Sequence, residues 1–177
     1  MLEEVWPEFR VIPVDAPEVH DDQLTAWEMA QINAYRKARA VAKKIPDALV
    51  LAADTLVYLD RETKLFGKPA DHAEAFKMLK ELQGRTHAVI TGVCLMHLRE
   101  HRQRVFAEWT DVRFHPLTAE QIRKYLALIN PLDKAGAYAI QEHGELVVAE
   151  ISGSYSNVVG LPLERVREEL GDWPRPV

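Results

Sequence analysis

The segment from Pro46 to Thr55 limits the fold more than any other part of the chain. A proline and an aspartate form a turn signal, six apolar residues follow, and the run ends in Asp54 and Thr55. A short unbroken apolar run after a helical pattern predicts a strand that is covered on both faces. Open α/β sheets bind ligands at the carboxyl ends of their strands, so Asp54 is a candidate site residue at the end of this strand. The alternative is that Asp54 only caps the turn that follows.

Composition indicates one globular domain over residues 1–177, or one domain with two lobes, because 47% of the residues are hydrophobic and 28% are charged. No apolar run is long enough to span a bilayer, and no segment resembles a signal peptide. The single cysteine, Cys94, excludes an intramolecular disulfide, and the cytoplasm is the simplest location. A net charge of −5 gives no general attraction to nucleic acid. We therefore expect no nucleic-acid or membrane partner, and a homodimer stays open.

Periodicity and capping signals predict alternating strands and helices. Pairs such as Thr25 with Glu28, Asp71 with Glu74, and Thr118 with Gln121 resemble capping boxes, which begin helices. Gly92 suggests a bulge in the longest strand. Residues 2–8 resemble the end of a helix. The predicted strands are 9–14, 48–60, 85–98, 105–114 and 146–151, the helices are 26–44, 71–84, 118–129 and 162–171, and the polar turns or loops are 61–64, 99–104 and 152–157.

Two lysines have unusual surroundings. Lys37 lies within the apolar stripe of the helix predicted at 26–44, so either its ammonium reaches water along its own stem or it points into a cleft above the sheet. Lys68 stands between Gly67 and Pro69, which restrict its backbone. The alternative is that Lys68 is an ordinary exposed lysine in a turn between a strand and a helix. Neither lysine is expected to contribute much stability.

Polar residues in two further segments are candidates for ligand contacts. The loop at 15–22 carries several acids, which are either solvated or supply a metal ligand, since oxygen ligands suit magnesium. Asp133 and Lys134 precede Gly136 and small residues, which would allow a ligand to approach closely. The alternative for this second segment is a plain turn that enters a strand. The chain has no H-E-x-x-H, G-x-S-x-G, P-loop or G-x-G-x-x-G motif.

Five segments occur in a specific order along the chain. They are Ala52-Ala-Asp-Thr55, Leu65-Phe-Gly-Lys-Pro69, Leu82-Gln-Gly-Arg-Thr-His87 with Thr91-Gly92, Pro131-Leu-Asp-Lys-Ala-Gly-Ala-Tyr-Ala-Ile-Gln141, and Gly153-Ser-Tyr-Ser-Asn-Val-Val-Gly-Leu-Pro162. Together they resemble the motifs of the Maf family of nucleoside triphosphate pyrophosphatases. The first motif reads G-A-D-T in the family, and here Ala52 replaces the glycine.

This resemblance implies an α/β fold with a mixed, twisted sheet, flanking helices and a central cleft. It also implies hydrolysis of a nucleoside triphosphate to a monophosphate and pyrophosphate, with Mg²⁺ or Mn²⁺. By position, Asp54 would be the general base, and Lys68 and Lys37 would neutralise the triphosphate. Glu18 would hold the metal together with Asp54.

The resemblance also bears on the choice of substrate. Thr55 and Gln141 match positions that select the base in the dTTP/UTP-type subgroup. Asp133 and Lys134 lie in the same family block as Gln141 and would be further substrate contacts. The alternative function is a non-catalytic nucleotide-binding or regulatory protein on the same fold, linked to cell division.

One departure from the family concerns its opening strand and S-x-S-P-R-R loop, which have no counterpart in this sequence. Either the start has been assigned too late or this part has been lost. The two arginines of that loop would make bidentate phosphate contacts that lysine cannot reproduce. We therefore expect weaker catalysis from the chain as numbered than from one that carries the loop.

Overall fold

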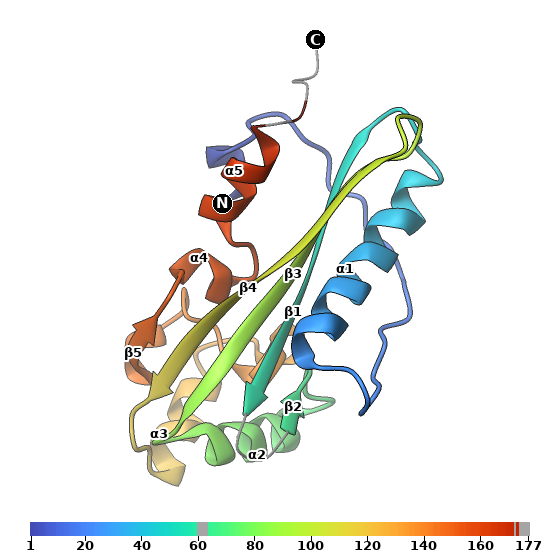
Figure 1. The fold of residues 1–177 in the computed structure, drawn as a ribbon. Coiled ribbons are helices and arrows are strands. Elements are labelled where there is room, and N and C mark those ends of the chain that lie inside the picture. The colour runs from blue at the N-terminus through green and yellow to red at the C-terminus, as the bar shows by residue number, and fades with distance from the viewer. Residues whose placement is uncertain (60–63, 172, 174–177) are drawn as a thin grey trace.

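The computed structural model describes residues 1–59, 64–171 and 173 and contains a five-stranded sheet flanked by helices (Figure 1). Every described strand pairing is antiparallel. The predicted α/β class with flanking helices is confirmed, but the sheet is antiparallel in all its described pairings and not mixed as predicted. In the order β2-β1-β3-β4-β5, the strands are Lys64–Phe66, Leu49–Leu59, Thr86–His97, Arg102–Phe114 and Val148–Ser152.

The helices begin largely where the capping signals predict. Thr25 and Thr118 both form reciprocal capping boxes, whereas Asp71 caps its helix and the Glu74 carboxylate accepts from the N–H of Ala70. No helix among the described residues is long and apolar enough to cross a bilayer. The α-helices are α1 Ala26–Ala42, α2 His72–Leu82, α3 Ala119–Leu126, α4 Tyr155–Val159 and α5 Leu163–Leu170, and the 3-10 helices are η1 Leu2–Glu4, η3 Pro131–Asp133, η4 Ala135–Ala137 and η5 Gly144–Leu146.

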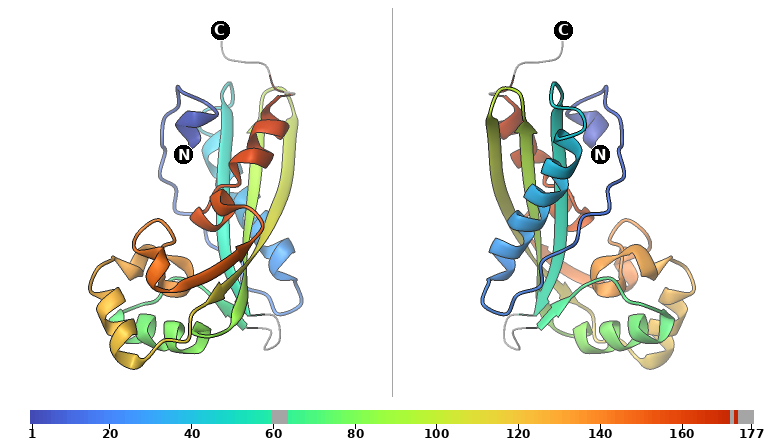
Figure 2. Two further views of the ribbon diagram at one scale, coloured as in Figure 1. Left: turned by 90° about the vertical axis from the view of Figure 1, so that its left-hand side faces the viewer. Right: turned by 90° about the vertical axis from the view of Figure 1, so that its right-hand side faces the viewer.

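Helices α1 and α5 cover opposite faces of the sheet (Figure 2). Strand β3 serves both layers because successive side chains of a strand point to opposite faces. Cys94 and Met96 pack with the alanines of α1, whereas Val93 and Leu95 pack with Val166 and its neighbours on α5. The strand that is buried on both faces is therefore β3, from His87 to Met96.

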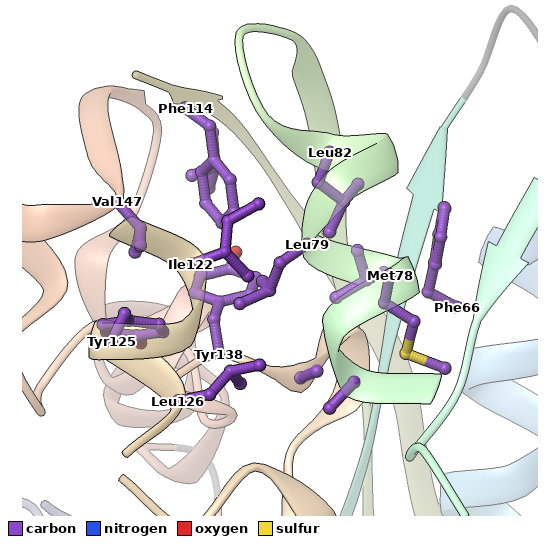
Figure 3. Close-up of a cluster of buried hydrophobic side chains, with 14 of the residues drawn as sticks. Phe66, Met78, Leu79, Leu82, Phe114, Ile122, Tyr125, Leu126, Tyr138 and Val147 are labelled. Carbon is purple, nitrogen blue, oxygen red and sulfur yellow. The ribbon is translucent and has the colours of Figure 1, made fainter. Parts of the chain in front are cut away.

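A further hydrophobic cluster closes the end of the sheet beneath residues 131–142. Helices α2 and α3 enclose it together with aromatic side chains of β4 and the segment after η4 (Figure 3). Tyr125 and Phe114 are the largest fully buried side chains among the described residues. This cluster gives the segment 131–142 a rigid base, although that segment contains only short 3-10 turns.

The predicted strand at 9–14 is wrong, because this segment pairs with no described strand. Ile12 and Val14 pack instead against the apolar cluster beneath α1, and Figures 1 and 2 show the segment running alongside that helix. Val11 is 80% exposed. Pro13 has no N–H to donate to a neighbouring strand. The segment therefore runs as an extended chain outside the sheet, with alternate apolar side chains packed against α1. Of residues 2–8, predicted as the end of a helix, only Leu2–Glu4 are helical, in the short η1.

The closing segments also differ from the sequence patterns. The predicted loop at 152–157 contains the start of α4, which Ser154 caps by accepting from the N–H of Asn157. The predicted strand at 146–151 begins only at Val148, because residues 144–146 form η5. The predicted continuation of β1 holds as far as Leu59. Asp60 and residues 61–63 of the turn predicted at 61–64 lie outside the described residues, and Lys64 begins β2.

Candidate active site

A cavity of about 330 Å³ lies along the edge of β1. Strand β2 pairs with β1 only from Val57 to Leu59, so residues 53–56 have no partner on that side among the described strands. The cavity is also lined by α1, the loop at 15–22, the Gly67–Lys68 turn and residues 133–142. All eight residues that the sequence pointed to line it: Glu18, Lys37, Asp54, Thr55, Lys68, Asp133, Lys134 and Gln141.

The prediction that Asp54 ends its strand is wrong, since Asp54 lies in the middle of β1, opposite Gly92. The apolar pattern resumes after Thr55 and carries the strand on to Leu59. The side chain of Asp54 is on the α1 face, and the residue is only 5% exposed. Oδ1 accepts from Lys37 Nζ at 2.5 Å, and Oδ2 accepts from Asn33 Nδ2 at 3.2 Å. These two donors offset the cost of burying the carboxylate.

Gly92 allows α1 to lie close to this carboxylate. A Cβ at Gly92 would be 2.2 Å from the carbonyl oxygen of Ala30, so any larger residue would push the helix away. The predicted bulge at Gly92 is wrong, because the residue pairs in register with Asp54 and with Ala107. Ala34, one turn along the helix, is completely buried as well. The glycine thus allows two backbones to approach closely, which is the other common role of glycine in a strand besides a bulge.

Lys37 bridges two acidic side chains on the cavity wall. Its ammonium donates to Asp54 Oδ1 and, at 2.9 Å, to Glu18 Oε1. Burial favours a lower pKa for Lys37, but hydrogen bonds and charge from the two carboxylates outweigh it and raise the pKa. Burial likewise favours a higher pKa for Glu18, but Lys37, with help from Lys68 and His20, lowers it. Glu18 and Lys37 are therefore both charged at neutral pH.

The opposite wall is built from turns. Gly136 has a φ of +70°, and its N–H donates to the Gly67 carbonyl at 3.0 Å, which joins η4 to the turn that carries Lys68. Lys68 is exposed and faces the same cavity as Glu18. Lys134 Nζ lies 3.3 Å from Asp133 Oδ2 and 3.7 Å from a carboxylate oxygen of Glu142. The segment at 131–137 is thus a pair of 3-10 turns next to the cavity.

Thr55 and Gln141 differ in how firmly they are held. Thr55 Oγ1 lies 3.0 Å from Thr91 Oγ1, and Thr91 in turn donates to the carbonyl of Asn157 in α4. Gln141 is exposed, and its Nε2 contacts the sulfur of Met1 at 3.8 Å, which is a weak interaction. The hydroxyl of Thr55 is therefore fixed by the sheet, whereas Gln141 is free to reorient toward a ligand.

Sequence reasoning missed three polar residues at this site. His20 and Glu142 line the cavity, and Asn33 holds Asp54 from behind. Asn33 had a usable signal, because it lies four residues before Lys37 and so shares its face of the helix, where most positions are alanine. His20 and Glu142 have no such signal, because their loops show no periodicity.

The carboxylates of this site fit the protein's share of a magnesium site. Within the described part of the chain, no three His, Cys, Asp or Glu side chains converge. Glu18 and Asp54 do converge, because the ammonium of Lys37 contacts both of them. Mg²⁺ is usually held by one or two carboxylates, with substrate phosphates and water completing the shell. Glu18 and Asp54, which both contact the ammonium of Lys37, supply the two carboxylates that such a site needs.

Comparison with known proteins agrees with the motifs. A family model described as Maf-like protein matches residues 1–173. The chain belongs to the Maf family. The dTTP/UTP pyrophosphatase of Carboxydothermus hydrogenoformans is 46% identical over 175 residues, which cover 98% of this chain and 91% of the relative. The dTTP/UTP pyrophosphatase of Symbiobacterium thermophilum is 48% identical over 164 residues, covering 93% and 81%. The Maf resemblance drawn from the five segments is confirmed.

Proposed function

We propose that this protein hydrolyses dTTP and UTP to the monophosphate and pyrophosphate. The observation that carries the proposal is the placement of a buried carboxylate, Asp54, beside a cavity with lysines on opposite walls, Lys37 and Lys68. Relatives named as dTTP/UTP pyrophosphatases, at 40% identity or more over nearly the whole chain, support the same activity.

In the proposed reaction, water attacks the α-phosphorus, the bond from that phosphorus to the bridging oxygen breaks, and pyrophosphate leaves. Asp54 accepts the proton of the attacking water as a general base. Lys37 and Lys68 offset the charge of the triphosphate from two sides of the cavity. Such contacts are worth about 1 kcal/mol each in water and about 4 kcal/mol when partly buried, so they overcome a net charge of −5.

Glu18 and Asp54 would hold the divalent cation, Mg²⁺ or Mn²⁺. When bound, such a cation polarises phosphate oxygens and offsets the charge that develops on them. Lys37 then has both carboxylates and a phosphate within its reach. Its role in this proposal is to hold the two carboxylates together before substrate arrives and to bind phosphate afterwards.

The other four of the eight predicted residues, Thr55, Gln141, Asp133 and Lys134, are proposed to bind substrate. Thr55, held by Thr91, presents a hydroxyl that cannot move far, and Gln141 presents both a donor and an acceptor. These groups suit the donor and acceptor edge of a thymine or uracil base. Asp133 and Lys134 lie on the same wall and would contact sugar or phosphate. A cytoplasmic location remains a prediction, and a homodimer stays open.

A pyrophosphate-release assay across the standard and modified triphosphates tests the proposal. We expect dTTP and UTP to be hydrolysed fastest, with release of one pyrophosphate per monophosphate formed, and we expect chelation of divalent cations to stop the reaction. Nucleotide binding without any release, in the presence of Mg²⁺ and of Mn²⁺, would instead favour the non-catalytic regulatory alternative.

A further inference from the structure

Asn33 contacts both of the elements that carry the acidic side chains of the site. It is only 1% exposed. Its Oδ1 accepts from the backbone N–H of Val19 at 2.7 Å, and its Nδ2 donates to Asp54 Oδ2 at 3.2 Å. These partners lie 14 residues before Asn33 and 21 residues after it. One amide on α1 therefore connects the loop at 15–22 to the middle of β1.

The orientation of this amide follows from its partners. The N–H of Val19 can only donate, so it must meet the amide oxygen. An ionised carboxylate can only accept, so Asp54 must meet the amide nitrogen. A flipped amide would face a donor with a donor and an acceptor with an acceptor. Because buried polar groups are almost always paired with a complementary partner, the structure permits one orientation only.

This arrangement makes the two oxygens of Asp54 unequal. Oδ2 is taken by Asn33, whereas Oδ1 is on the side of Lys37 and, through it, of Glu18. Val19 is the direct neighbour of Glu18 in the chain. The same amide that orients Asp54 therefore also anchors the backbone beside the second carboxylate.

We propose that Asn33 is a positioning residue that holds Asp54 with Oδ1 toward the cavity and fixes the Glu18 segment against α1. The proposal rests on the proposed pyrophosphatase function for its catalytic consequence only. The competing explanation is that Asn33 is a buried polar residue whose loss lowers stability without any specific effect on turnover.

Two variants separate the two ends of the amide. Asn33→Asp has the same shape and keeps an oxygen that can accept from Val19, but it places a carboxylate against Asp54 instead of a donor. Asn33→Leu loses both interactions. Val41→Ala is the matched control, since Val41 is a buried residue of the same helix that does not line the cavity. Each is compared with the wild-type chain by kcat, KM and amide hydrogen exchange at Val19.

We expect kcat to fall by at least about tenfold in Asn33→Asp and in Asn33→Leu, with KM changing by less than about threefold, because a misplaced catalytic group affects turnover more than binding. Val41→Ala should keep kcat within about twofold at equal folded fraction. Exchange protection at Val19 should be retained in Asn33→Asp and lost in Asn33→Leu. If both Asn33 variants keep the kcat of the control, or if Val19 exchange is unchanged in Asn33→Leu, the proposal is overturned.

The exchange measurement does not depend on activity. A wild-type chain that hydrolyses no triphosphate would overturn the proposed function. The exchange pattern at Val19 would then decide by itself whether Asn33 fixes the Glu18 segment. If Asn33→Leu does not fold, the split between kcat and KM in Asn33→Asp decides the role of the contact to Asp54.

Discussion

The two walls of the cavity are built in different ways. The carboxylate wall is formed by Glu18, Lys37 and Asp54, with Asn33 behind Asp54. It is a continuous network that joins the loop at 15–22, α1 and β1, and both Asn33 and Asp54 are buried. The turn wall, formed by Gly67–Lys68 and residues 133–142, has exposed charged side chains and longer ion pairs.

This difference suggests a division of labour. Groups that act on a reacting atom must be held to within a fraction of an ångström, and buried hydrogen-bonded groups meet that demand. Exposed ion pairs contribute about 0–1 kcal/mol, so side chains on the turn wall exchange partners at little cost. The carboxylate wall suits chemistry, and the turn wall suits recognition of substrates that differ in their base.

The largest expected effect is on turnover when the carboxylate wall loses Asp54, the proposed general base. Asp54→Asn should lower kcat by about 10²–10⁴, because an amide of the same shape cannot accept the proton of water. Asp133→Asn, the matched change on the turn wall, should lower kcat by less than about tenfold. Pyrophosphate release measures both, with circular dichroism to confirm folding. Equal losses in the two variants would remove the distinction between the walls.

Stability should distinguish the two lysines. Lys37→Met leaves Asp54 buried without its cation and should lower the free energy of unfolding by about 3 kcal/mol, since breaking a buried ion pair leaves a charge uncompensated. Lys68→Met should change it by less than about 0.5 kcal/mol. The sequence by itself predicted little cost for either. Urea denaturation of both variants measures the change in the free energy of unfolding. An effect at Lys37 as small as that at Lys68 would contradict the buried network.

Mild acid should weaken the support of the turn wall. His87 donates to or accepts from the hydroxyl of Tyr138, a cavity residue, at 3.0 Å, and stacks edge-on against Phe114. Burial lowers the pKa of His87 from 6.5 to about 4. Below pH 6.5 the unfolded chain therefore binds a proton that the folded chain does not, so stability decreases as pH falls toward 4.

From pH 7 to pH 5 this histidine should account for about 2 kcal/mol of lost stability. The measurement is urea denaturation of the wild type and of His87→Leu at both pH values. The variant should be less sensitive to pH by that amount. Identical pH profiles would mean that folding does not shift the pKa of His87.

The smallest expected effect concerns base selection. Gln141→Leu should reduce the preference for dTTP and UTP over CTP by about fivefold to tenfold, because one exposed hydrogen bond is worth about 1 kcal/mol. Glu142→Gln, a neighbouring change on the same wall, should leave that preference unchanged. Ratios of kcat/KM for the three nucleotides measure it. A loss in kcat alone, with no change in the ratios, would place Gln141 outside base recognition.

Much of the fold was visible in local patterns. Thr25 and Thr118 begin helices because a hydroxyl and a side chain three residues later satisfy backbone donors within one turn. The prediction of a strand at 9–14 was wrong, because alternating apolar residues do not show whether the segment pairs with a strand or packs against a helix. The helix at α4 was missed although Ser154 carries an ordinary cap signal.

The sequence by itself determined the family, the class of fold and eight residues that line one cavity. Only the tertiary structure decided what those residues touch. Lys37 turns inward because Asp54, 17 residues away, and Glu18, 19 residues away, lie against its helix. Gly92 is a point of contact for α1, which no pattern within its own strand reveals. Helical and strand periods and caps are set by neighbours in the chain, whereas hydrogen bonds across the cavity depend on how whole elements pack.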